Sequence, residues 1–207
     1  MRDRGRRTLV VSFDDAYRSV PELALPVLAE LGVPATVFVP TGEMSEGSLR
    51  VWPGVEEWLG GESEQELTGA SWAELEPLSA AGWELGSHTR THPHLTALDD
   101  ESLRRELQGS REDCVAATGL PCPALAYPFG EADARVAAAA KAAGYELATT
   151  LADRIPAPVN GSPDPLLWPR LGVHQQDSAA RLRLKSELFL HARPAWNAAQ
   201  SLRGASR

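Results

Sequence analysis

Short apolar runs alternate along this chain with segments whose apolar residues recur every three to four positions. Apolar runs of four to eight residues, rich in β-branched and aromatic side chains, are typical of buried strands. The intervening segments carry helix start and stop signals, such as a capping box at Ser71 and glycines after the last turn. The predicted strands are residues 8–13, 35–39, 83–86, 124–127, 145–149 and 166–173. The predicted helices are residues 21–31, 71–82, 99–118 and 132–143, and a basic helix from about Ser178.

Regular alternation of strand and helix predicts a parallel sheet with right-handed crossovers. Six strands in 207 residues fall short of the eight, in about 250 residues, of a full (β/α)8 barrel. We therefore expect an α/β fold, an incomplete (β/α) barrel, as one domain over residues 1–207. A helical C-terminal tail is expected from about residue 175. Residues 42–70 form a long glycine-rich and acidic loop, and loops of that length in a compact domain are usually functional.

Polar motifs follow four of the predicted strands. They are Asp14-Asp15, His88 with His92, Pro128-Phe129-Gly130, and Arg170 with His174. Active sites of parallel α/β folds lie at the carboxyl ends of the strands. The motifs are therefore expected to meet in one site.

Composition limits the class of protein and its partners. The net charge of −8 argues against nucleic-acid binding, which usually requires a basic surface. No apolar run approaches the ~18 residues of a membrane span, and only about four apolar residues follow the N-terminal arginines, too few for a signal peptide. The expectation is a soluble, cytoplasmic chain without a membrane span. Cys114 and Cys122 lie outside any metal-binding pattern and are interpreted as thiols, with a disulfide between them left open.

The two motifs nearest the N-terminus carry candidate metal ligands. His88 and His92 are four residues apart, so one helical turn would place both rings on the same side, where two imidazoles suit a divalent metal. In Asp14-Asp15, successive side chains of a strand point to opposite faces, so one carboxylate can bind metal while the other acts as a base. Two histidines and one carboxylate leave coordination positions for water and substrate. The alternative interpretations are that the two histidines are unrelated surface residues, and that the acidic pair is a cap or lies in a solvated loop.

The same residues carry a resemblance to a known family. Residues 12–15, Ser-Phe-Asp-Asp, resemble the TFDD motif of the polysaccharide deacetylases, the NodB-type carbohydrate esterases. Residues 87–93 resemble the family's H-[ST]-x-x-H-P motif, and residues 126–130 resemble its R-x-P-Y-G motif. The order and separation of these motifs agree, and the similarity extends from about Thr8 to Val173.

The resemblance implies a distorted (β/α) barrel and metal-dependent removal of acetyl groups from a glycan. It assigns Asp14 as general base, and it assigns one divalent metal, zinc, to Asp15, His88 and His92. Tyr127 and Phe129 fall in the block that contributes to substrate binding in this family. The backbone N–H at position 129 would bind the oxyanion, and a backbone donor is kept when the side chain changes from Tyr to Phe.

The later motifs depart from the family pattern. Ala126 replaces an arginine that orients the catalytic aspartate, and Arg170 is a candidate substitute. Leu167 replaces the second acid of D-x-x-D-W, whereas Trp168 is retained as a candidate wall for the acetyl methyl group. His174, which follows a predicted strand, is the candidate general acid; His94 and His191 are the other choices.

Three alternative functions are left open. The first is an intracellular deacylase of a small amide or sugar nucleotide, in place of a long acetylated glycan. The second is a non-haem iron oxygenase, which also uses two histidines and a carboxylate, although typically on a β-sandwich. The third is a non-catalytic glycan-binding relative, which the altered later motifs favour and the intact metal ligands oppose.

Overall fold

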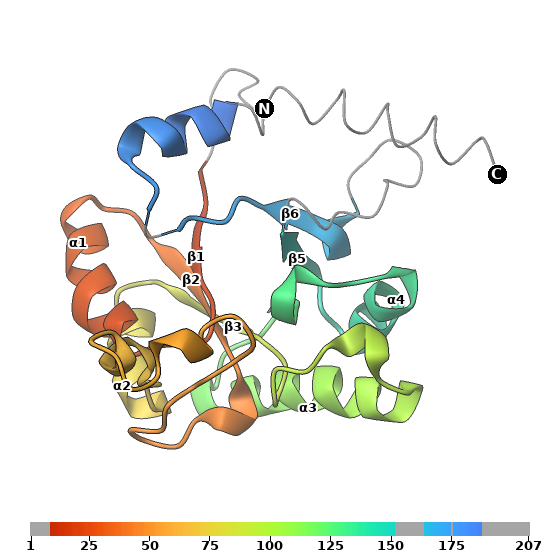
Figure 1. Ribbon diagram of the computed structural model, residues 1–207. Coiled ribbons are helices and arrows are strands. Elements are labelled where there is room, and N and C mark those ends of the chain that lie inside the picture. The colour runs from red at the N-terminus through yellow and green to blue at the C-terminus, as the bar shows by residue number, and fades with distance from the viewer. Residues whose placement is uncertain (1–8, 152–163, 175, 188–207) are drawn as a thin grey trace. The chain divides into compact units, whose positions relative to one another are not determined.

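The computed structural model describes residues 9–151, 164–174 and 176–187 (Figure 1). The chain forms two compact units. The first comprises residues 1–92 and 105–122, and the second comprises residues 93–104 and 123–207. The long helix α3 (Asp100–Thr118) contributes residues to both units.

The first unit is built on three parallel strands, β1 (Val11–Phe13), β2 (Ala35–Val39) and β3 (Glu84–Ser87). Val11 pairs with Ala35 in the β1–β2 ladder, and Val37 pairs with Leu85 in the β2–β3 ladder. The second strand has four buried residues out of five, as its apolar run predicts for a strand covered on both faces. All three strands agree with the sequence prediction within a few residues.

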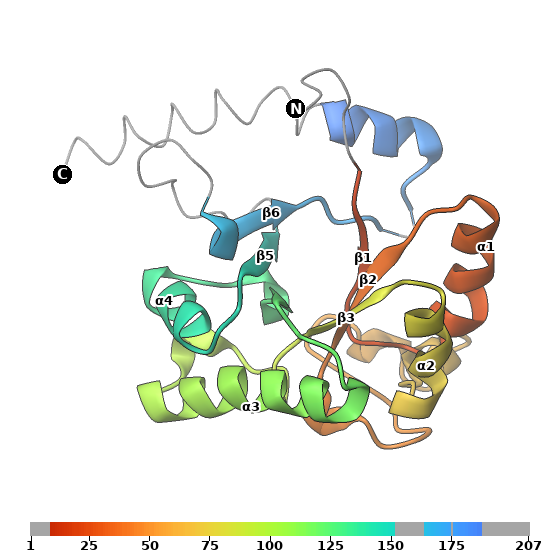
Figure 2. The ribbon, with the colours of Figure 1, turned by 180° about the vertical axis from the view of Figure 1, so that it is seen from behind.

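Helix α2 (Trp72–Ala80) covers the core of the first unit, as Figure 2 shows from behind. The Ser71 hydroxyl accepts the Glu74 N–H, and the Glu74 carboxylate accepts the Ser71 N–H, so the predicted capping box is present. The helix buries Leu75 and Leu78 completely against the strands. Burial of two leucines is worth about 3–6 kcal/mol in transfer free energy, which fixes the helix on the sheet.

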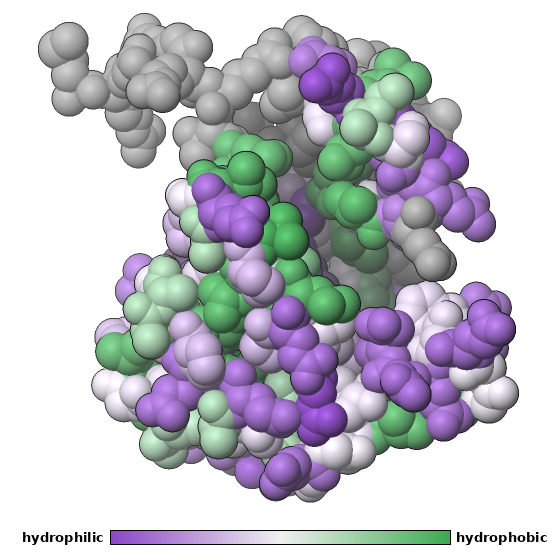
Figure 3. All heavy atoms as spheres, turned by 90° about the vertical axis from the view of Figure 1, so that its left-hand side faces the viewer, coloured by the Kyte–Doolittle hydropathy of each residue, from purple (hydrophilic) through white to green (hydrophobic). Residues whose placement is uncertain are grey.

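The helix predicted at residues 21–31 consists of two different segments. Residues Val20–Ala24 form a π-helical turn, η1, and α1 begins only at Leu25 and ends at Glu30. Pro26 has no N–H, so it cannot make the usual bond to the carbonyl four residues earlier, and this favours the wider turn before it. The apolar side chains Leu23, Val27 and Leu31 on this segment are exposed. Figure 3 shows that hydrophobic side chains gather on the face of the molecule that it views.

The second unit also holds three parallel strands, β4 (Ala124–Ala126), β5 (Leu147–Leu151) and β6 (Trp168–Arg170). Helix α4 (Ala134–Ala142) is capped by the Asp133 carboxylate, which accepts the Val136 N–H. The strand predicted at residues 166–173 is shorter, because Asp164 caps a 3-10 turn at Pro165–Leu167 that precedes it. Residues 179–187 are helical, in agreement with the predicted C-terminal helix, whose remaining residues lie outside the described ones.

Candidate metal centre

The acidic pair lies directly after β1 in a strained backbone segment. Asp15 has a φ of 66° and Ala16 has a φ of 48°. Such left-handed conformations cost non-glycine residues roughly 1–2 kcal/mol each. The prediction that the two carboxylates point to opposite faces is wrong, because strand alternation ends at Phe13. Oδ2 of Asp14 is 4.0 Å from His88 Nε2, and Oδ1 of Asp15 is 3.6 Å from the same nitrogen.

The two histidines follow β3 in an irregular loop. The prediction of a helical turn across residues 88–92 is wrong, because Thr89 has a φ of 65° and His92 a φ of 56°. The Thr89 hydroxyl accepts the His92 N–H at 3.1 Å, which closes the loop without a helix. The two rings nevertheless meet, with centroids 4.8 Å apart and planes at 74°.

Glu106 of α3 holds this histidine loop from outside. Its carboxylate accepts the Arg90 N–H at 2.8 Å, the Thr91 N–H at 3.0 Å and the Thr91 hydroxyl at 2.8 Å. Bonds to an ionised acceptor are stronger than neutral ones, so the carboxylate fixes the backbone between the two histidines. Sequence reasoning missed Glu106, because nothing in the motif spacing indicates that α3 faces this loop.

Asp15, His88 and His92 form a compact set of donors. One ligand atom from each lies within 4.8 Å of the others, and Asp15 Oδ1 is 3.6 Å from His88 Nε2 and 3.5 Å from His92 Nε2. Atoms that ligate one zinc ion at about 2.1 Å with tetrahedral angles lie roughly 3.4 Å apart. Asp15 Oδ1 is buried and accepts no hydrogen bond among the described residues. The donor set therefore fits zinc, and the metal would bind the oxygen that the protein leaves unbonded.

The surroundings of Asp15 also raise the pKa of its carboxylate. Desolvation raises its pKa to about 6, and the Asp14 carboxylate adds to the rise. His88, Trp52 and Arg50 act in the opposite direction. A buried carboxylate of raised pKa near two histidines is typical of a site that a cation completes.

Two residues of the loop between β2 and α2 line the centre. Trp52 stacks on His92, with ring centroids 4.3 Å apart and planes at 19°. Arg50 is 1% exposed and donates to the Asp15 carbonyl at 2.7 Å. The sequence indicated only that this loop is functional. Neither residue belongs to a recognised motif, so their contacts could not be predicted.

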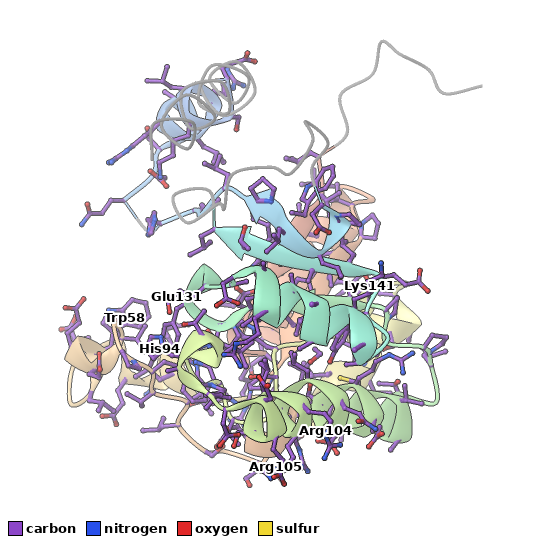
Figure 4. The ribbon with its side chains drawn as sticks, turned by 90° about the vertical axis from the view of Figure 1, so that its right-hand side faces the viewer. Trp58, His94, Arg104, Arg105, Glu131 and Lys141 are labelled. Atoms are coloured by element: carbon purple, nitrogen blue, oxygen red, sulfur yellow. The ribbon has the colours of Figure 1, made fainter. Side chains whose placement is uncertain are left out.

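The Tyr127–Gly130 block lies in the second unit, after β4. Tyr127 is fully buried and its hydroxyl donates to the Leu166 carbonyl at 2.8 Å, so its side chain belongs to the core of this unit. Phe129 has a φ of 58° and stacks on His94, with centroids 4.0 Å apart. Figure 4 shows His94 beside Glu131, whose carboxylate lies 2.9 Å from His94 Nδ1.

Backbone strain is concentrated in the three motifs. Among the described residues, five non-glycine residues have positive φ; four of them fall in the motif segments, and Ala16 directly follows the first motif. Strained backbone clusters at functional sites, where the surrounding structure stabilises it. The strained residues are Asp15, Ala16, Thr89, His92 and Phe129.

Trp168, Arg170 and His174 also belong to the second unit. Trp168 is the first residue of β6 and is 42% exposed, so its side chain is accessible to a ligand. Arg170 ends the same strand, and His174 is exposed in the segment that follows. Their roles toward Asp14 and the substrate stay predictions. His191, an alternative acid, lies outside the described residues.

Comparison with known proteins identifies the family. The profile of the polysaccharide deacetylases matches residues 1–148. This chain belongs to the polysaccharide deacetylase family. A chitooligosaccharide deacetylase of Rhizobium leguminosarum bv. trifolii is 30% identical over 172 residues, which cover 81% of this chain and 62% of the relative. The chain thus spans less than two thirds of that relative.

Solved structures show the same fold. The Streptococcus pyogenes deacetylase PplD, in complex with acetate, matches 88% of this chain and 71% of its own, with a TM-score of 0.68 and 18% identity. The polysaccharide deacetylase BC0361 from Bacillus cereus matches 85% of this chain and 50% of its own, with a TM-score of 0.64 and 26% identity. The predicted incomplete (β/α) barrel of the polysaccharide deacetylase type is therefore confirmed. No helix among the described residues is long and apolar enough to cross a membrane.

Proposed function

We propose that this chain is a metal-dependent hydrolase that removes acetyl groups from a carbohydrate. The observation that carries the proposal is the convergence of Asp15, His88 and His92 beside a second carboxylate, Asp14. Membership of the polysaccharide deacetylase family and the likeness to a chitooligosaccharide deacetylase support the same chemistry.

The three convergent residues would hold one divalent metal, for which their two nitrogens and one oxygen favour zinc. When bound there, such an ion polarises an acyl carbonyl and lowers the pKa of water. Asp15 would bind the metal in its ionised form, because the charge of the cation offsets the desolvation that raises the pKa of this carboxylate.

Asp14 is proposed as the general base. Its side chain is 31% exposed, so water and substrate can reach it, and it is absent from the tight ligand cluster. As a base it takes a proton from water, whose oxygen adds to the acetyl carbonyl carbon. Cleavage of the bond from that carbon to nitrogen or oxygen then releases acetate, and the departing amine or alcohol takes up a proton.

Residues of the second unit complete the proposal. Phe129 offers its backbone N–H to the oxyanion, and Trp168 packs against the acetyl methyl group. Arg170 orients Asp14. His174 gives a proton to the leaving group, because an amide nitrogen must be protonated in order to depart. We do not propose that the Tyr127 side chain contacts substrate, because this side chain is fully buried.

Acetate release tests the proposed function. The zinc-loaded chain is incubated with N-acetylated chitooligosaccharides, an O-acetylated xylan and an N-acetylated sugar nucleotide, and free acetate is measured enzymatically. We expect release from an acetylated glycan, loss on chelation, and recovery when zinc is restored. Turnover of the sugar nucleotide alone would favour the small-molecule alternative. A zinc-loaded chain that releases no acetate but binds glycan would support the non-catalytic alternative.

A further inference from the structure

Arg50 is an unusual buried cation in the loop between β2 and α2, which can be followed in orange in Figure 1. Its guanidinium makes five hydrogen bonds among the described residues, and none of the acceptors is a carboxylate. The acceptors are the carbonyl oxygens of Glu43, Asp15, Ala16 and Ala70 and the sulfur of Met44. A fully buried arginine is costly unless such bonds stabilise it, so its partners indicate its role.

Two of these carbonyls belong to the strained segment after β1. Arg50 Nη1 donates both to Asp15 and to Ala16, the two consecutive residues with positive φ. The Ala16 carbonyl also accepts the Ala70 N–H at 2.9 Å. A guanidinium that binds both carbonyls stabilises a backbone conformation that the two side chains disfavour.

The loop is itself organised around the Arg50 side chain. The Arg50 N–H donates to the Leu67 carbonyl, and the Gly69 N–H donates to the Ser48 carbonyl, so two stretches of the loop pair with each other. A Cβ on Gly69 would lie 2.5 Å from Arg50 Nε. The absence of a side chain at position 69 therefore leaves room for the guanidinium.

We propose that Arg50 is a positioning residue of the metal centre, which fixes the left-handed turn that directs the Asp15 carboxylate toward His88 and His92. This inference rests on the proposed function. The role is geometric, because Arg50 acts on the main chain of Asp15 and not on its carboxylate.

The experiment compares three single variants, and one double variant of Arg50→Lys with Gly69→Ala, by their affinity for zinc. Arg50→Lys keeps the charge but loses the planar set of donors. Gly69→Ala keeps Arg50 and displaces its guanidinium. The control, Gly61→Ala, lies in the same loop, where the added Cβ would be 3.5 Å from the Trp58 carbonyl, an ordinary contact.

Zinc dissociation constants are measured on metal-free protein by competition with a chromophoric chelator, and circular dichroism reports the folded state and the melting temperature. We expect Arg50→Lys and Gly69→Ala to weaken zinc binding about 10–100-fold, as is usual for residues that orient ligands, and Gly61→Ala to match wild type. The double variant should bind zinc no more weakly than Arg50→Lys, because both changes act through one guanidinium.

A purely structural role gives a different result. Folded variants with wild-type zinc affinity, even with lowered melting temperatures, would overturn the inference, as would complete loss of folding in both variants. If only Gly69→Ala fails to fold, Arg50→Lys decides the matter. A wild-type chain that binds zinc but releases no acetate would contradict the proposed function and leave the role of Arg50 intact.

Discussion

At the scale of single residues, neighbouring histidines of this chain have contrasting surroundings. His88 is 2% exposed and lies 3.6 Å from Asp15, whereas the side chain of His94 is 50% exposed and pairs with Glu131. A buried imidazole next to two carboxylates is suited to bind a metal, whereas an exposed imidazole beside one carboxylate contributes little to stability. Two histidines only six positions apart in the sequence are thus expected to respond differently to the same substitution.

His88→Ala should lose most of its zinc. Removal of a direct ligand should weaken binding by more than about 100-fold, because loss of an orienting partner alone costs about 10–100-fold. Elemental analysis of protein purified without added metal, together with chelator competition, provides the measurement. His94→Ala is the matched control and should keep wild-type zinc content. Full occupancy in His88→Ala would contradict the ligand assignment.

At the scale of elements, the site is assembled from the ends of β1 and β3 and from the loop that precedes α2. The strand-end segments supply the charged and imidazole groups, and the loop contacts them from the side through Trp52 and Arg50. Trp52 is in direct ring contact with His92, so its surroundings change when His92 binds a metal.

Trp52 should therefore report metal binding. We expect zinc to change the indole fluorescence of the metal-free chain, and Trp52→Phe to remove most of that change. Trp58→Phe, in the same loop, should retain it. Titration of each variant with zinc at neutral pH is the measurement. An unaltered fluorescence response in Trp52→Phe would show that the stack on His92 is not part of the metal centre.

The sequence predicted the strands of both units and the residues at their ends, because apolar runs and residue types depend on local chemistry. It did not predict how Asp15, Thr89 and His92 adopt positive φ, since these conformations are stabilised by distant partners. The ligands meet through these irregular turns and not through the helical turn and strand alternation that the spacing suggested. Local patterns identified the ligands, and long-range contacts determined their geometry.

At the scale of the whole molecule, Asp15 couples the metal centre to stability. Its pKa of about 6 in the folded chain exceeds the ordinary value of 3.8, so the folded metal-free chain binds this proton more tightly than the unfolded chain does. Folding therefore opposes ionisation of Asp15. The penalty is fully present above about pH 6 and disappears as the pH falls toward 4.

Asp15→Asn should stabilise the metal-free protein by about 3 kcal/mol at pH 7.5, because it removes a charge whose desolvation opposes folding. The difference from wild type should shrink as the pH falls to 4, where Asp15 is protonated in the folded chain and partly protonated in the unfolded chain. Urea denaturation of chelator-treated proteins at the two pH values is the measurement. A variant no more stable than wild type at pH 7.5 would show that the charge of Asp15 is not costly.

We propose that Asp14 acts as a base beside a metal held by Asp15, His88 and His92. Acetate release from an acetylated chitooligosaccharide, measured for wild type and Asp14→Asn with the zinc content of each, tests it most directly. We predict that the variant keeps one zinc per chain and loses activity by about 10²–10⁴-fold. An Asp14→Asn protein that turns over substrate like wild type would show that Asp14 is not the base, and one that loses its zinc would show that Asp14 is a metal ligand.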